Sequence, residues 1–335
     1  MASSKSEINL ITSLDSAAII GHGRILSFLE KAVRGDRLAH AYLFVGPEHV
    51  GKMAVARQLA AAVLGAETPL DRHPDFLVVG RGCDAKTGKL HADIVLDQVH
   101  VLRGWLARGS MMGGWKAVVI DGAQFLNKEA ANALLKNLEE PRERTLIILL
   151  SEAADDTFPT IRSRCQIMTF GRVATAEISR ALVAQGLQAE KAELWARLAA
   201  GCPGKALAFA RDPEAFRSMA ARRELLLNLP EAEITDRWAI LERSVPAKLP
   251  FNEAVLRASE TLDLLAELLR DALLAAHGRQ DRLTHIDVQE RLAAWPAKLG
   301  AKKIGAVLQE ISDAKRLLAE NVNPRAVLES LALSF

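Results

Sequence analysis

The residues with the clearest chemistry form a glycine-rich turn, Gly46-Pro-Glu-His-Val-Gly51-Lys52. Glycines at this spacing let backbone N–H groups surround a phosphate, and the adjacent lysine can neutralise phosphate charge. The turn follows an apolar run at residues 41–45 and opens a helix-like pattern. Because phosphate loops connect a strand to a helix, we interpret this segment as a phosphate loop. An ordinary strand–helix turn is the alternative.

Two groups that a working ATPase needs are missing from this sequence. A phosphate loop normally carries Ser or Thr after the lysine, since the hydroxyl ligates Mg²⁺. Here that position is Met53, whose thioether is a poor ligand for a hard cation. Asp121 ends an apolar run and could approach the same cation, but Gly122 stands where hydrolytic members of this broad class place a water-activating Glu. Gln124 could orient a water only if a turn brought it round.

We therefore predict a degenerate nucleotide site formed by Gly46, Gly51, Lys52 and Asp121. Such a site could bind nucleotide weakly and would not hydrolyse it. No cofactor is required by this interpretation.

Composition narrows the class of protein further. The 335 residues are half apolar and one quarter charged, enough for two or three globular domains. The net charge of +2 means that any nucleic-acid contact must come from a local patch or from partners. Three widely spaced cysteines, Cys83, Cys165 and Cys202, argue against a disulfide framework and suit a reducing cytoplasm. We expect no membrane span, because no apolar run is long enough.

The elements that must position these groups alternate along the first half of the chain. Nearly continuous apolar runs predict buried strands at residues 41–45, 75–79, 116–121, 145–150 and 166–170. Helical patterns lie between or before them at residues 24–34, 51–64, 96–108 and 128–139. This alternation predicts an α/β domain built on a parallel sheet.

After residue 170 the strand signal disappears and the chain is helical to its end. Short helices occupy 171–213, and the strongest later helix is predicted at 252–276, with Gly278 as a stop signal. We predict three domains: 1–170, 171–213 and 214–335.

Three segments resemble the clamp-loader branch of the AAA+ proteins, which includes the clamp-loader subunits of bacterial DNA polymerase III. They are Leu38-Ala-His-Ala-Tyr-Leu-Phe-Val-Gly46, Asn132-Ala-Leu-Leu-Lys-Asn-Leu-Glu-Glu-Pro141 and Thr160-Ile-Arg-Ser-Arg-Cys165, with a looser match at Gly201–Leu207. The resemblance implies a P-loop NTPase-like AAA+ core, a small helical lid and an all-α collar through which subunits assemble. Met53 and Gly122 favour the inert stator type of subunit over the motor type.

The Ser-Arg-Cys element is the second candidate site. It lies between two predicted strands at the edge of the domain, where an exposed Arg could project across a subunit joint. A guanidinium supplied in trans stabilises the charge of a transferring phosphoryl group. The resemblance assigns this arginine-finger role to Arg164, supported by Ser163 and Cys165. The alternative is that Arg162 and Arg164 are surface charges or form local salt bridges.

The resemblance also implies partners. We expect a hetero-pentamer with motor subunits (gamma/tau) and a delta subunit, and contact with the sliding clamp and primed DNA through that assembly. Arg103, Arg108 and Lys116, near predicted helix and loop ends, would face duplex DNA. Two rivals stay open: a self-sufficient AAA+ ATPase of the gamma/tau motor type, and an AAA+-like scaffold outside replication.

Related subunits often carry a four-cysteine zinc module after the first helix. Here Cys83 stands alone, and His73 and His91 do not complete a tetrahedral site with recognisable spacing, so we predict that zinc is absent. Lys205 is either a lid residue that reaches nucleotide or a surface lysine. Trp238 and Trp295 are either core residues or interface anchors.

Overall fold

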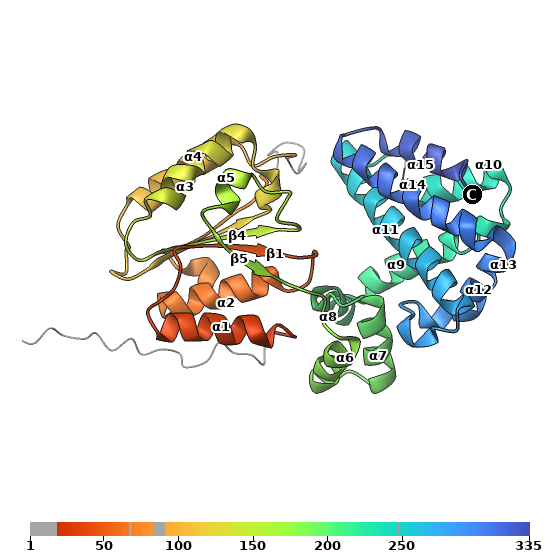
Figure 1. The fold of residues 1–335 in the computed structure, drawn as a ribbon, viewed down its shortest axis with the longest axis horizontal. Helices are drawn as coiled ribbons and strands as arrows, with labels where there is room; N and C mark the ends of the chain where they lie inside the picture. Colours follow the sequence, from red (N-terminus) through yellow and green to blue (C-terminus); the bar gives the residue numbers. More distant parts are fainter. Residues whose placement is uncertain (1–18, 67–68, 83–90, 247) are drawn as a thin grey trace, which may run out of the picture. The chain divides into compact units, whose positions relative to one another are not determined.

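The computed structural model of this chain describes residues 19–66, 69–82, 91–246 and 248–335. They form two compact units (Figure 1). The first runs to Ala181 and includes Gly201–Gly204, and the second comprises Leu182–Ala200 and Lys205–Phe335. The predicted boundaries at 170 and 213 stay predictions.

The first unit is built on a five-stranded sheet in which all neighbouring strands run parallel, in the order β2-β3-β4-β1-β5. The strands are β1 (Ala41–Val45), β2 (Phe76–Val79), β3 (Lys116–Asp121), β4 (Thr145–Ser151) and β5 (Gln166–Thr169). The predicted α/β class and parallel sheet are confirmed, and the predicted strand positions agree to within one residue at each end.

The apolar character of the strands follows from helices on both faces of the sheet (Figure 1). Tyr42 and Phe44 of β1 point into one apolar cluster, and Leu43 points into the other. The first cluster is completed by α1 (Gly23–Arg34) and α2 (Lys52–Leu64). The second is completed by α3 (Leu96–Ala107), α4 (Lys128–Glu139) and α5 (Pro159–Arg162).

The start of α4 shows how the sequence sets a helix boundary. Asn127 lies before the first turn, and its Oδ1 accepts a 2.8 Å hydrogen bond from the backbone N–H of Ala130. This cap satisfies one of the donors that a helix start leaves unpaired. The helix ends at Glu139, close to the point that its sequence pattern predicts.

Between and after the strands the remaining elements are helical. Short helices follow the sheet: α6 (Thr175–Ala184), α7 (Ala189–Leu198) and α8 (Pro203–Arg211). Brief 3-10 turns occur at Leu70–Arg72, Ala123–Phe125, Leu229–Glu231, Gln280–Arg282 and Ile286–Val288.

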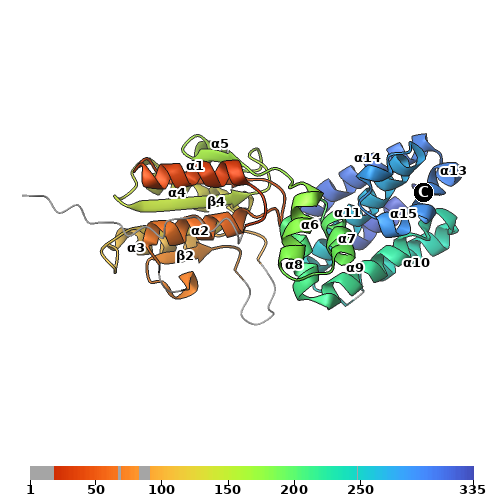
Figure 2. The same cartoon turned by 90° about the horizontal axis from the view of Figure 1, so that it is seen from below.

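The second unit is a helical bundle around α11 (Phe251–Ala276), the helix predicted at 252–276. It packs against α12 (Gln289–Ala293) and α14 (Ala301–Ala319), as Figures 1 and 2 show. The unit also contains α7, most of α8, α9 (Pro213–Leu226), α10 (Ile234–Ser244), α13 (Trp295–Leu299) and α15 (Pro324–Ala332). Trp295 is buried in this core and Trp238 packs against it, so both are core residues within this unit.

Candidate functional site

The phosphate-loop segment lies between β1 and α2, as predicted, and its first glycine is required by close packing. Gly46 has a φ of 152°, and a Cβ at this position would lie 2.3 Å from the carbonyl oxygen of Phe170. Its N–H donates to the carbonyl oxygens of Ser151 and Glu152 at the end of β4. Gly51, with a φ of 120°, precedes the first residue of α2. Both glycines therefore serve the geometry of the turn.

The side chain of Lys52 is bound to its own loop. Its Nζ donates a hydrogen bond to the carbonyl oxygen of Gly46 and another, 2.8 Å long, to that of Pro47. Burial lowers the pKa of the Lys52 ammonium, and nearby carboxylates, that of Glu152 foremost, oppose this shift. A phosphate would have to compete with these carbonyl oxygens for the ammonium.

Lys52 and Asp121, far apart in sequence, meet in one hollow of about 260 Å³. Its lining comprises Glu48, Lys52, Gly80, Arg81, Asp121, Gly122, Gln124, Phe125, Leu150, Ser151 and Glu152. Three carboxylates therefore face two cations. This balance opposes the binding of a polyphosphate, because like charges repel in a partly desolvated site.

The pKa shifts in the hollow arise first from burial and then from the neighbouring charges. Desolvation by the surrounding walls raises the pKa of Asp121, Lys52 opposes the rise, and Glu48 adds to it. Arg81 lies over the ring of Phe125, with its guanidinium carbon 3.8 Å from the ring centroid. A cation held on an aromatic face in this way is less available to a ligand.

The two substituted positions have structural reasons of their own. Met53 packs, partly buried, against the apolar cluster of α1 and α2. Gly122 has a φ of 89°, and a Cβ there would lie 2.5 Å from Cδ2 of Phe125. The following 3-10 turn brings Gln124 into the lining, where its Nε2 donates to Oε1 of Glu152 at 3.4 Å.

Sequence reasoning missed Glu48, Arg81 and Glu152 as lining residues. Glu48 stands inside the glycine-rich turn, and Glu152 directly follows β4. Because parallel strands end at a common edge of the sheet, residues just after them gather there, and that signal could have found Glu152.

Arg164 lies in a separate site, directly after α5. Its Nη2 is 2.5 Å from Oε1 of Glu139, and its Nη1 donates to the carbonyl oxygen of Thr160 at 2.8 Å and to Oγ of Ser163 at 3.2 Å. The Arg164 side chain is 33% exposed, so a neighbouring molecule could reach it. Arg162, equally exposed, pairs with Asp155 instead.

Ser163 and Cys165 flank this arginine. The Ser163 hydroxyl donates to the carbonyl oxygen of Thr160 at 3.1 Å, which ties the turn after α5 to itself. Cys165 is half-buried, and burial raises the pKa of its thiol to about 12. A thiol of this kind stays protonated at neutral pH and is a poor nucleophile. Ser163 therefore stabilises the turn, and Cys165 packs against the apolar cluster of α3 and α4.

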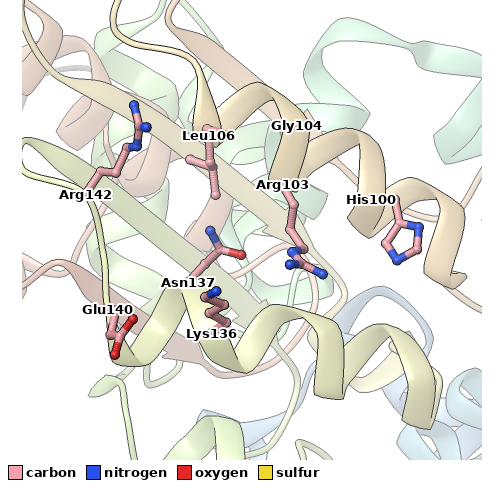
Figure 3. A pocket seen from close by; sticks show the side chains of 9 residues that line it. His100, Arg103, Gly104, Leu106, Lys136, Asn137, Glu140 and Arg142 are labelled. Carbon is pink, nitrogen blue, oxygen red and sulfur yellow. The ribbon is translucent and has the colours of Figure 1, made fainter.

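The residues proposed to face DNA separate in the structure. Arg103 lines a hollow of about 570 Å³ with His100, Lys136 and Arg142, between α3 and the end of α4 (Figure 3). The expectation for Lys116 is wrong, because its side chain is buried. Its Nζ donates to carbonyl oxygens at the end of α3 and lies 4.0 Å from the centroid of the Trp105 ring.

The described residues contain neither a cluster of metal-ligating side chains nor a membrane-spanning helix. Cys83 lies outside these residues, and within them no cluster of His, Cys, Asp or Glu side chains could hold a metal ion. The ring of His73 accepts a local hydrogen bond from the backbone N–H of Asp75. In the described part of the chain, every helix is too short or too polar to cross a bilayer.

Comparisons with known proteins agree with this architecture. A family model described as "DNA polymerase III, delta subunit" matches residues 21–174, and one described as "DNA polymerase III, delta subunit, C terminal" matches residues 218–335. A DNA polymerase III subunit delta' from Bacillus subtilis is 26% identical over 331 residues, covering 92% of this chain and 94% of that relative. A tau subunit from the same organism is 29% identical over 189 residues, covering 52% of this chain and 33% of that relative.

A solved structure shows the same fold. A DNA polymerase III gamma subunit-related protein from Thermotoga maritima aligns with a TM-score of 0.52 at 17% identity, covering 91% of this chain and 97% of that one. Sheet, phosphate loop and helical C-terminal region define an AAA+ protein of the clamp-loader type. Within that class, the chain belongs to the DNA polymerase III delta-prime family.

Proposed function

We propose that this clamp-loader subunit is a stator that does not hydrolyse ATP. The observation that carries the proposal is Gly122, at the position of the water-activating carboxylate. Its φ of 89° and the Phe125 ring, whose Cδ2 would lie 2.5 Å from an added Cβ, both disfavour a side chain there. Met53 removes the hydroxyl ligand for Mg²⁺, and Lys52 is held by loop carbonyl oxygens. These features belong to the backbone and packing of the site, so they act together against turnover.

Arg164 completes the proposal, as an arginine finger supplied to the ATP site of an adjacent subunit. It lies outside the hollow around Lys52 and is one-third exposed. A guanidinium at that place can stabilise the γ-phosphoryl group of a neighbour's ATP. The subunit thereby contributes to catalysis without being an enzyme by itself, as an accessory subunit of the polymerase holoenzyme.

The partners follow from this role. The subunit would assemble with gamma/tau motor subunits and a delta subunit in a hetero-pentamer, and would help load the sliding clamp onto primed DNA. The proposed lid is residues 171–213, and the proposed collar is residues 214–335. Arg103, Lys136 and Arg142, around the hollow of Figure 3, are the cationic side chains available there for weak DNA contact.

A self-sufficient motor is the second candidate function, and the similarity to a tau subunit is the observation that favours it. ATP turnover by the purified chain separates the two. We expect no Mg²⁺-dependent hydrolysis above background, because metal ligand and base are absent. Robust turnover that Lys52→Ala abolishes would establish the motor function instead.

The trans role is tested in the reconstituted loader, by clamp- and primed-DNA-stimulated ATP turnover. Arg164→Ala should lower turnover at the affected site by about 10³-fold while assembly, checked by gel filtration, stays intact. Arg162→Ala is the matched control, because Arg162 lies on the same turn with the same 33% exposure. If both variants turn over ATP at the wild-type rate, the Ser-Arg-Cys element has only a structural role.

A further inference from the structure

Within this chain, the guanidinium of Arg164 is already engaged on both terminal nitrogens. Nη1 bonds to its own turn, through the Thr160 carbonyl oxygen and the Ser163 hydroxyl. Nη2 contacts the Glu139 carboxylate at 2.5 Å, the one charged group among these partners. The contacts with its own turn orient the guanidinium, and the Glu139 carboxylate offsets its charge.

The position of Glu139 is unfavourable for helix stability. It is the last residue of α4, and a carboxylate there faces the negative end of the helix dipole. The adjacent Glu140 lines the hollow of Figure 3 and makes no ion pair with any residue that the structure describes. Helix stability therefore gives no reason for a carboxylate at position 139, whereas its contact with Arg164 does.

We propose that Glu139 is a latch that restrains the arginine finger until the γ-phosphate of a neighbour's nucleotide displaces it. The inference rests on the proposed trans role of Arg164. While the ion pair is closed, the finger carries no net charge toward a neighbour. A phosphate carries more charge than a carboxylate and also accepts bidentate hydrogen bonds from arginine, so it can exchange for Glu139.

The exposure of the pair sets the strength of the latch. The side chains of Arg164 and Glu139 are 33% and 48% exposed, so water and salt screen their attraction. Pairs of this kind contribute at most about a fivefold factor to an equilibrium. The latch is therefore weak enough to open at a nucleotide-bound joint, and at an empty joint it favours the closed ion pair by at most about fivefold.

The test is stimulated ATP turnover in the reconstituted loader with Glu139→Gln, which keeps the shape of the side chain but removes its charge. We expect turnover at subsaturating ATP to rise by about twofold to fivefold, because the finger no longer has to leave a carboxylate. Glu129→Gln, at an exposed carboxylate at the other end of α4 that lines neither hollow, is the matched control and should leave the rate unchanged. Glu139→Asp, which keeps the charge but shortens the reach, should raise turnover by a smaller factor and serves if the Gln variant fails to assemble.

Two further arms separate a latch from a merely structural role. In an Arg164→Ala background, Glu139→Gln should change nothing. The ratio of the Glu139→Gln rate to the wild-type rate should also fall toward one near 1 M salt, where exposed pairs are screened. A lower or unchanged rate for Glu139→Gln, with Arg164→Ala still impaired, overturns the latch alone. An unimpaired Arg164→Ala loader overturns the trans role and the latch with it.

Discussion

Lys52 and Pro47 are joined by a 2.8 Å hydrogen bond, from the lysine Nζ to the proline carbonyl oxygen, within the glycine-rich turn itself. In a working phosphate loop that ammonium neutralises the β- and γ-phosphates of a nucleotide. Here the ammonium donates hydrogen bonds to carbonyl oxygens of the loop, and three nearby carboxylates offset its positive charge. The site retains the backbone shape of a phosphate loop, but its three carboxylates offset the positive charge that would attract a nucleotide's phosphates.

The first prediction concerns this charge balance. Glu152→Gln should tighten binding of a fluorescent ATP analogue to the isolated chain by about fivefold, since one carboxylate about 4 Å from a phosphate charge costs about 1 kcal/mol where water screens the pair as fully as in bulk. Fluorescence anisotropy measures the affinity. Asp155→Asn, at an exposed carboxylate outside the lining, is the control. Equal affinity in both variants would show that the carboxylates do not set nucleotide binding.

The second prediction concerns the missing base. Gly122→Ala should destabilise the chain by about 1–3 kcal/mol, because alanine tolerates neither the φ of 89° nor the contact with Phe125. Urea unfolding measures the free energy. Gly104→Ala, in α3 with open space around the glycine, should instead stabilise by about 0.5–1 kcal/mol.

Because of this backbone strain, we expect that reintroducing the base at position 122 and a hydroxyl at position 53 does not produce ATP hydrolysis. Gly122→Glu combined with Met53→Ser should show no ATP turnover, since the backbone cannot hold the new carboxylate in place. Measurable hydrolysis by this double variant would contradict the structural account of the loss.

The third prediction concerns Asp75, a fully buried carboxylate beside β2. It accepts hydrogen bonds from the backbone N–H groups of Met111 and Met112, each at 2.9 Å, and from the Ser110 hydroxyl at 2.8 Å. Burial alone raises the pKa of Asp75, but these bonds and Lys116 outweigh it and hold the pKa below its ordinary value. Asp75→Asn should cost about 1–3 kcal/mol at pH 7, because one N–H donor loses its acceptor.

The sign of the pH dependence follows from the lowered pKa. Asp75 contributes its full stabilisation above the unfolded-state pKa of about 3.9, and loses it as the pH falls through the lower folded-state pKa. The stability difference between wild type and Asp75→Asn should therefore be flat above about pH 5 and shrink in more acidic buffer. Asp71→Asn, at an exposed ion pair with Arg57, should cost less than about 1 kcal/mol.

The fourth prediction concerns the thiol beside the finger. With a pKa of about 12, Cys165 should react with iodoacetamide far more slowly in the native chain than in urea, because only the thiolate attacks. Peptide mapping by mass spectrometry measures the two rates at pH 8. We expect a difference of at least about 100-fold, given the loss of thiolate. Similar rates would mean that the turn after α5 opens freely.

The sequence by itself determined the strands, the principal helices and the chemical losses in the phosphate loop. Continuous apolar runs predict buried parallel strands, and the glycine spacing of the next turn indicates a phosphate loop because it stands between a strand and a helix. The losses at Met53 and Gly122 can be recognised from residue type alone, because each replaces a residue that ATP hydrolysis needs. All of these signals are local, so they need no knowledge of what lies beside them.

The tertiary structure alone decided which distant groups meet. Lys116 was expected to face DNA, yet it is buried at the end of α3, because a pattern of helix and strand ends does not say where a long side chain points. Glu152 reaches Lys52 only because β4 lies beside β1 in the sheet. Likewise, Glu139 and Arg164 pair only because the fold sets the end of α4 beside α5. Contacts of this kind depend on packing between elements, which the order of residues along the chain does not reveal.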